Sequence, residues 1–270
     1  MQSVKRAQPD IRAIARLIPA SGNLVQGQNE TQLNPALARS VSDVVQEGLN
    51  HYSFFEGIDE LRRAVSEKVR THNAVNIDAD RRPLELIVTP GATGGIVSIC
   101  HTYLRDSSAV VFEPYYPYHK RSLETCNGRA EVVKLRGHLL ELDPDELRRV
   151  CRAGKDRSEH PLKAIVVCSP ANPTGRVFTR HELQSIVDCA EEFDLLIVSD
   201  EVYEHFTLSA SDHVSAVITK YYRIGSEMGG VEFLTVRSLW RASQRPLKPF
   251  FRAPDRIPAF VVFGELTLSP

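Results

Sequence analysis

The amino-acid sequence predicts an α/β fold, with a mixed, mostly parallel β-sheet lying between layers of helices. From about residue 57 to residue 206, short β-rich runs alternate with segments of helical periodicity. Several of these runs are continuously apolar, which is typical of parallel strands covered on both faces. Turns rich in Gly, Pro and Asn follow them and separate the elements.

The first predicted elements lie between residues 57 and 134. Apolar side chains recur at helical spacing over residues 57–73, which predicts an amphipathic helix. A strand at residues 84–88 ends at Pro90-Gly91, and a helical pattern follows over residues 92–104. Two further strands are predicted at residues 109–112 and 130–134.

Two clear helix starts mark the next part of the chain. Asp143 is a favoured N-cap residue, and Pro144 suits the first helical position. Thr179 and Glu182 have the spacing of a capping box. Buried-type strands are predicted at residues 164–168 and 195–198, and weaker ones at 231–236 and 259–263.

Composition excludes several classes of protein. The 270 residues are 42% hydrophobic and 25% charged, which argues against collagen-like and disordered chains. A net charge of -1 gives no reason to expect nucleic acid as a partner, and no apolar run is long enough to span a bilayer. Five scattered cysteines without a CxxC pair indicate a reducing compartment, so we expect a cytoplasmic protein. Residues 1–18 are basic and helix-like, but Asp10 and the shortage of Ser disfavour a mitochondrial presequence.

Charge and proline content divide the chain. Residues 219–270 hold eight Lys/Arg and four Asp/Glu, a charge of +4, which leaves -5 for the first 218 residues. Five of the 16 prolines lie in this last segment. We therefore expect an N-terminal arm and helix at residues 1–50, a partial large domain at 51–218, and a divergent basic, Pro-rich tail at 219–270.

Three segments after strands contain polar side chains. They are Thr89-Pro-Gly-Ala-Thr-Gly-Gly95, Ser169-Pro-Ala-Asn-Pro-Thr-Gly175 and Ser199-Asp-Glu-Val-Tyr203. Ligands of open α/β sheets collect at the carboxyl ends of strands, so these segments form the candidate site. The first also opens a helix, whose backbone N–H groups suit a phosphate. Neither a Walker loop nor a GxGxxG fingerprint is present, and this makes a Rossmann dehydrogenase a distant alternative.

Together, the order and spacing of these segments resemble the class I/II aminotransferases, which are fold-type-I pyridoxal-phosphate (PLP) enzymes. The Asn-Pro-Thr-Gly and Asp-Glu-x-Tyr motifs are the specific part of a resemblance that runs from about Asn23 to about Phe206. It implies the PLP-dependent transferase large-domain fold, with no counterpart for the family's small C-terminal domain. It also implies PLP as cofactor, amino acids and 2-oxo acids as substrates, and a homodimer.

The resemblance implies roles for residues around the cofactor's phosphate and ring. Ala92 and Thr93 would donate hydrogen bonds to the phosphate, and Tyr52 would reach the phosphate bound by the partner subunit. Tyr116, within Glu113-Pro-Tyr-Tyr-Pro-Tyr118, would stack on the pyridine ring. Gly27, at the end of Asn23-Leu-Val-Gln-Gly27, would lie near the substrate carboxylate.

Three further matching residues would bind the polar atoms of the ring. Asn172 and Tyr203 would donate hydrogen bonds to the phenolic oxygen. Asp200 would pair with the pyridine nitrogen and keep it protonated, which makes the ring a better electron sink. Taken singly, each of these residues is better interpreted as a turn residue, a packed aromatic or a helix cap, but together and in the family's order they favour the cofactor roles.

The lysine that such enzymes need for their Schiff base does not stand in its expected motif. Lys220 and Lys248 are the only lysines after Asp200. The segment most similar to Ser-x-Ser-Lys has Gln244 after Ser243, where the motif has lysine. Glutamine cannot form an imine, so we expect no catalytic residue and an impaired enzyme. The change after residue 218 favours a truncated or altered product over a deliberate non-catalytic relative.

Alternatives to an aminotransferase relative remain. One is a PLP enzyme of the aminocyclopropane-carboxylate synthase or C–S lyase type, and another is a non-enzymatic PLP-binding or partner module. The nine histidines show no metal-ligand spacing and HExxH is absent, so no metal site is predicted.

Overall fold

The computed structural model describes residues 34–48, 51–73, 86–207, 215, 233–238 and 260–264. The chain divides into two compact units, Met1–His51 and Tyr52–Pro270. In the first unit, helix α2 (Pro35–Gln46) starts at Asn34, whose side chain accepts a hydrogen bond from the Ala36 backbone N–H at 2.9 Å. No helix in the described ranges combines the length and apolar character needed to cross a membrane.

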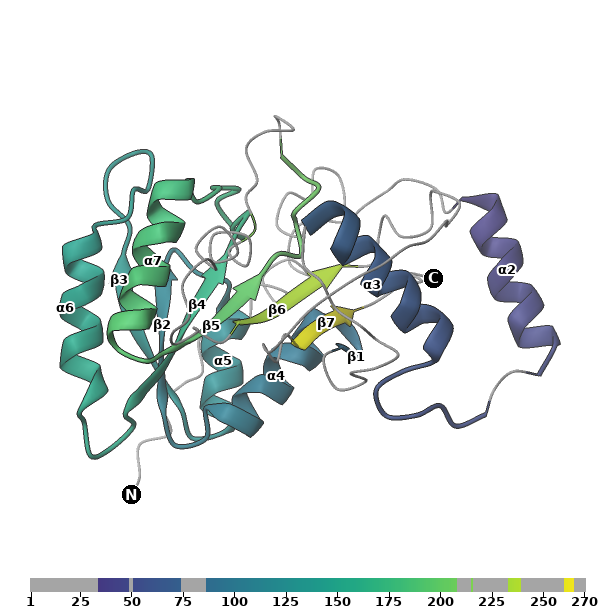
Figure 1. The fold of residues 1–270 in the computed structure, drawn as a ribbon, viewed down its shortest axis with the longest axis horizontal. Helices are drawn as coiled ribbons and strands as arrows, with labels where there is room; N and C mark the ends of the chain where they lie inside the picture. The colour runs from purple at the N-terminus through teal and green to yellow at the C-terminus, as the bar shows by residue number, and fades with distance from the viewer. Residues whose placement is uncertain are drawn as a thin grey trace, which may run out of the picture. The chain divides into compact units, whose positions relative to one another are not determined.

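The second unit is built on a parallel sheet of seven strands in the order β1-β7-β6-β5-β4-β2-β3 (Figure 1). The strands are β1 (Leu86–Val88), β2 (Ser108–Glu113), β3 (Arg129–Lys134), β4 (Leu162–Cys168), β5 (Leu196–Asp200), β6 (Phe233–Ser238) and β7 (Phe260–Gly264). The helices are α3 (Asp59–Asn73), α4 (Gly91–Tyr103), α5 (Pro117–Thr125), α6 (Pro144–Lys155) and α7 (Arg180–Glu192). Every pairing between these strands is parallel, so their carboxyl ends meet at one edge. The α/β fold class is confirmed.

Helices cover both faces of the sheet, because side chains along each strand alternate between two cores. On one face, Val110 and Ile165 join a core with residues of α3, α6 and α7. On the other, Ala109 and Val166 join a core with residues of α4 and α5. This arrangement explains why the strands read as continuous apolar runs.

Strands β6 and β7 fill the middle of the sheet, between β1 and β5. Val198 of β5 is in register with Leu234 of β6, and Ile87 of β1 with Val262 of β7. Both strands come from the basic, Pro-rich segment after residue 218. The weak strands predicted at 231–236 and 259–263 therefore pair with their neighbours, and without them β1 and β5 would expose unpaired backbone groups. The division of the chain at residue 218 stays a prediction.

The predicted helix starts are confirmed. The Asp143 side chain accepts from the backbone N–H groups of Asp145 and Glu146, and Thr179 and Glu182 form a complete capping box. Helix α5 was not predicted, although Pro117 at its first turn is a recognised start signal. Residues 1–18, predicted as helix-like, lie outside the described residues.

Helix α6 packs closely against β4 at Gly154. A Cβ atom at Gly154 would lie 2.9 Å from Leu162 Cβ, which real structures do not tolerate. Gly154→Ala is therefore expected to lower the free energy of unfolding by about 1–3 kcal/mol through overpacking. Helix propensity alone would instead raise it by up to about 1 kcal/mol. Urea unfolding of both proteins distinguishes these signs, and a more stable variant would contradict the close packing.

Glu182 holds the loop after β4 to the start of α7. Its carboxylate accepts from the Leu142 and Thr179 backbone N–H groups, each at 2.9 Å, and pairs with Arg176. Burial alone would raise the pKa of Glu182, but these hydrogen bonds and the Arg176 charge lower it below the ordinary value. A lowered pKa in the folded state means that the ionised form stabilises the fold.

Glu182→Gln is expected to lower the free energy of unfolding at pH 7 by about 1–3 kcal/mol, since charged hydrogen bonds are lost. The contribution is present above the ordinary Glu pKa of 4.5 and is lost as pH falls through the lower folded-state value. The stability difference between the two proteins should therefore shrink as the pH falls below 4.5. Chemical unfolding across pH measures it, with exposed Glu159→Gln as the matched control. A pH-independent difference would show that charge at Glu182 is unimportant.

Candidate functional site

The candidate site lies where β4 and β5 end. Cys168 and Asp200 are the last residues of these strands and are register partners, so their side chains lie next to each other on one face. This face is the one covered by α4 and α5, because Val166 and Val198 contribute to the same core. Asp200 is only 5% exposed. A buried carboxylate in this position needs hydrogen-bond donors.

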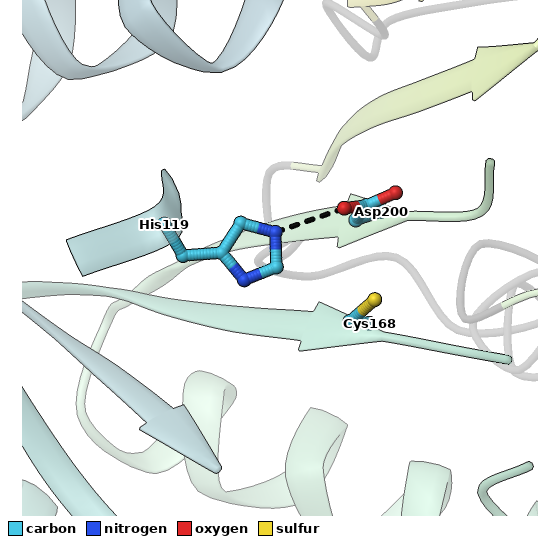
Figure 2. A group of neighbouring side chains, drawn as sticks. All are labelled: His119, Cys168 and Asp200. Atoms are coloured by element: carbon cyan, nitrogen blue, oxygen red, sulfur yellow. Dashed lines mark hydrogen bonds and ion pairs between the residues drawn. The ribbon is translucent and has the colours of Figure 1, made fainter. Parts of the chain in front are cut away.

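His119 and the Val202 backbone both hold the Asp200 carboxylate. His119 of α5 points its ring at Asp200, with 2.8 Å between Nε2 and Oδ2 (Figure 2). The Val202 backbone N–H donates to Oδ1 at 3.2 Å. An ionised carboxylate only accepts hydrogen bonds, so the His119 tautomer with its proton on Nε2 is the one that can donate to it. The carboxylate is therefore fixed in orientation before any ligand binds.

Two tyrosine side chains lie next to His119 and next to each other. The Tyr116 ring meets the His119 ring edge-on, with 5.6 Å between centroids. It also stacks on Tyr118 with a centroid separation of 5.2 Å. Tyr116 is half-buried and is the N-cap residue of α5, two residues after cis-linked Pro114. The first turn of α5 thus places an aromatic ring beside the residue that holds Asp200.

Asn172 and Tyr203 lie near Asp200 from two different loops. Asn172 sits in a tight turn after β4, closed by hydrogen bonds from Gly175 N to Ala171 O at 2.7 Å and from Ala171 N to Arg176 O at 2.8 Å. Burial, followed by the charge of Asp200, raises the pKa of Tyr203, and a hydrogen bond with the Asn172 side chain opposes this rise. The Tyr203 hydroxyl group therefore keeps its proton at neutral pH and can donate a hydrogen bond.

Cys168 is a protonated thiol in this arrangement. Burial and the neighbouring Asp200 charge raise its pKa well above the ordinary thiol value, although a hydrogen bond with the Asn172 backbone opposes them. Its Sγ atom lies 3.7 Å from the Pro170 carbonyl oxygen. A thiol that keeps its proton is a weak nucleophile.

The segment after β5 is tied to helix α3. Glu204, next to Tyr203, forms a buried ion pair with Lys68, and its Oε2 atom accepts from Asn73 Nδ2 at 2.8 Å. Removing one partner of a buried ion pair leaves an uncompensated charge, so the contact is costly to break. This tie holds the backbone that carries Tyr203.

The start of α4 provides backbone donors. Its N-cap residue is Pro90, and no side chain caps the helix, whereas α2, α6 and α7 all begin with a capping side chain. The uncapped N–H groups carry the positive end of the helix dipole, which suits an anion. Ala92 packs against the core that α4 shares with α5, and Thr93 is exposed. These residues follow β1 at the same edge of the sheet as Asp200.

The structure thus brings Tyr116, Asn172, Asp200 and Tyr203 together, while their roles toward a cofactor stay predictions. Tyr52 is fully exposed, with a relative exposure of 107%, and is not part of this group. Gly27, Lys220 and Lys248 lie outside the residues that the structure describes.

Sequence reasoning missed His119 and gave Cys168 no role in the site. His119 is the third residue of α5, and Pro117 would have signalled that helix. Cys168 was assigned only to the end of a strand. Its position next to Asp200 depends on the register between β4 and β5, for which no local pattern exists.

Several curated proteins with similar sequences are aminotransferases. The chain is 35% identical to aromatic-amino-acid aminotransferase 2 of Thermococcus litoralis over 166 residues, which covers 61% of this chain and 40% of that protein. It is 31% identical to a probable N-succinyldiaminopimelate aminotransferase of Mycobacterium tuberculosis over 208 residues, covering 76% of this chain and 50% of that one. The chain therefore spans about half the length of the curated relatives it matches.

Solved structures agree with this assignment. N-succinyldiaminopimelate aminotransferase from Mycobacterium tuberculosis matches with a TM-score of 0.67 and 28% identity, covering 79% of this chain and 52% of that chain. A Thermus thermophilus aspartate aminotransferase mutant matches with a TM-score of 0.69 and 26% identity, and the match covers 88% of this chain and 60% of that chain. The fold implied by the resemblance is thus confirmed.

The family comparison covers most of the sequence. The family model for aminotransferase class I and II matches residues 20–240, which include every motif of the candidate site. Enzymes of this family depend on PLP. The chain therefore belongs to the class I and II aminotransferases.

Proposed function

We propose that this chain binds PLP at the carboxyl edge of the sheet, without a covalent bond to a lysine within these 270 residues. The observation that carries the proposal is the buried Asp200 carboxylate, held by His119 and Val202, with Tyr203 and Asn172 beside it. This donor and acceptor set suits a ring with a protonated nitrogen and a phenolic oxygen. PLP would supply an electron sink for the α-carbon of an amino acid.

Each residue has a task that follows from its position. Asp200 accepts a hydrogen bond from the ring nitrogen and keeps the proton there, and His119 keeps the carboxylate oriented. Tyr203 and Asn172 donate to the phenolic oxygen, since the Tyr203 hydroxyl stays protonated. Tyr116 packs against the ring, and the N–H groups of Ala92 and Thr93 receive the phosphate at the uncapped start of α4.

The substrate class follows from the family. We propose that the parent activity is amino transfer between amino acids and 2-oxo acids, as the names of the relatives suggest. A chain limited to these residues is expected to be catalytically impaired, because the sequence lacks the motif whose lysine amine moves the α-proton in this family. Lys220 and Lys248 do not stand in the Ser-x-Ser-Lys motif.

A homodimer is part of the same proposal. Tyr52, Phe54 and Phe55 are exposed at 107%, 75% and 76%. Adjacent exposed aromatic side chains are costly in water and are typical of interaction surfaces. A second copy of the chain would cover them, and Tyr52 would then approach the phosphate held by the partner.

The ring and phosphate contacts can be separated with PLP and pyridoxal, which lacks the phosphate. Asp200→Asn is expected to raise the dissociation constants of both ligands by about 10-fold or more, because a charge-assisted hydrogen bond is worth roughly 1.5–3 kcal/mol. Thr93→Val should weaken the binding of PLP several-fold and leave the binding of pyridoxal unchanged. Equilibrium dialysis measures the dissociation constants.

Exposed Asp156→Asn and Thr71→Val on α3 are matched controls and should bind both ligands as the parent chain does. If Asp200→Asn binds PLP like the parent, the proposed pocket is wrong. If Thr93→Val weakens both ligands equally, the phosphate assignment fails.

Covalent attachment is tested by borohydride reduction of the PLP-treated chain, followed by peptide mass spectrometry. We expect only substoichiometric surface adducts, which Asp200→Asn leaves unchanged, because no lysine is directed at the site by the family motif. A stoichiometric adduct on Lys220 or Lys248 that disappears in Asp200→Asn would show an active-site lysine and overturn the expected impairment.

A further inference from the structure

A second kind of ligand suits the edge where β4 and β5 end. His119, Cys168 and Asp200 each offer one ligand atom, and these atoms all lie within 4.8 Å of one another (Figure 2). The three side chains come from α5, β4 and β5, three different elements of the second unit. We propose that they form a binding site for a divalent transition-metal ion, with Zn²⁺ as the best match.

The chemistry of the three donors selects the metal. An imidazole nitrogen, a thiolate sulfur and a carboxylate oxygen together form a ligand set typical of zinc, whereas Mg²⁺ and Ca²⁺ prefer oxygen ligands. Three protein ligands leave a fourth position of a tetrahedral ion for water. The site therefore resembles open zinc sites more than the closed four-ligand sites that stabilise small domains.

The geometry requires only local movement. Ligand atoms around a tetrahedral zinc ion lie about 3.3–3.8 Å apart, given bonds of about 2.0–2.3 Å. The present atoms lie within 4.8 Å, so a shift of about an ångström brings them into place. Cys168 stands at the last position of β4 and keeps some solvent exposure. The register of Cys168 with Asp200 already holds two ligands on one face of the sheet.

Charge balance favours the ion in this buried position. His119 and Asp200 are 2% and 5% exposed, so an unbalanced charge would be costly there. Zn²⁺ bound by one thiolate, one carboxylate and one neutral imidazole carries no net charge. On binding, the Cys168 thiol releases its proton to water, and the proton of His119 moves to the ring nitrogen that does not bind the metal.

The metal and PLP would compete, because both need Asp200. The metal site itself does not rest on PLP binding, since its ligands are defined by the fold alone. The sequence predicted no metal site because the ligands are separated by 49 and 32 residues and form no local motif. Strand register and the position of α5 bring them together.

Co²⁺ is the probe for the site, added to the full, chelator-treated chain without a histidine tag. We expect one equivalent to give the intense visible spectrum of four-coordinate cobalt, with an ultraviolet sulfur-to-cobalt absorption that Zn²⁺ abolishes. Cys168→Ser should remove the ultraviolet band, and His119→Gln should weaken binding by at least about 10-fold. Cys126→Ser, at the end of α5, is the matched control and should retain both features.

Near-ultraviolet circular dichroism establishes that each variant is folded. A weak six-coordinate spectrum without the sulfur band, or a sulfur band that persists in Cys168→Ser, would overturn the proposal. Competition gives an independent readout: Zn²⁺ should reduce PLP binding to the parent chain but not to Cys168→Ser. If the parent chain binds no PLP at all, the PLP proposal fails while the cobalt spectrum still decides the metal site.

Discussion

The parallel pairing of β4 with β5 is the constraint on which the site depends. It places Cys168 beside Asp200 at the point where both strands end. Since neighbouring strands run in the same direction, the loops carrying Asn172 and Tyr203 leave the sheet at the same edge. A shift of one residue would turn Asp200 toward the opposite core, where α3, α6 and α7 pack. Strand register therefore controls which groups can meet a ligand.

Burial of Asp200 imposes the next condition. A carboxylate that is almost inaccessible to water must be satisfied by protein donors, and His119 and Val202 supply them. His119 can do so because α5 covers the same face of the sheet as the Asp200 side chain. The cost of burying a charge is thus offset by a donor that also fixes its orientation. Such a fixed acceptor is well suited to a cationic ligand, whether a protonated ring nitrogen or a metal ion.

The two central strands, β6 and β7, come from the segment after residue 218 and pair with β5 and β1, which come from the preceding part of the chain. β6 and β7 pair between β5 and β1, in positions that would otherwise leave two buried edges. The family match likewise extends to residue 240, past the change in charge and proline content. The sheet is complete at its centre even though the chain spans about half the length of its relatives.

Local chemistry made much of the fold predictable. Helix starts at Asp143 and Thr179 depend on hydrogen bonds within a few residues, so their side chains reveal them directly. The apolar strands were equally clear, because burial on both faces removes polar residues from them. Helix α5 was missed because its apolar pattern is short, and His119, which lies in this helix, was missed for the same reason. The order of motifs was sufficient to identify the family, and it named Tyr116, Asn172, Asp200 and Tyr203 without showing that they meet.

The sequence by itself therefore determines the set of elements, their caps and the family motifs, because short stretches of residues are enough to define each of them. The strand order, the two cores and the grouping of His119, Cys168 and Asp200 come from folding in three dimensions. Strand pairing joins residues that lie 21 or more positions apart in the sequence, and Cys168 and Asp200 lie 32 positions apart. No local pattern encodes such a contact, because register and crossover connections are chosen by the burial of whole faces rather than by adjacent side chains.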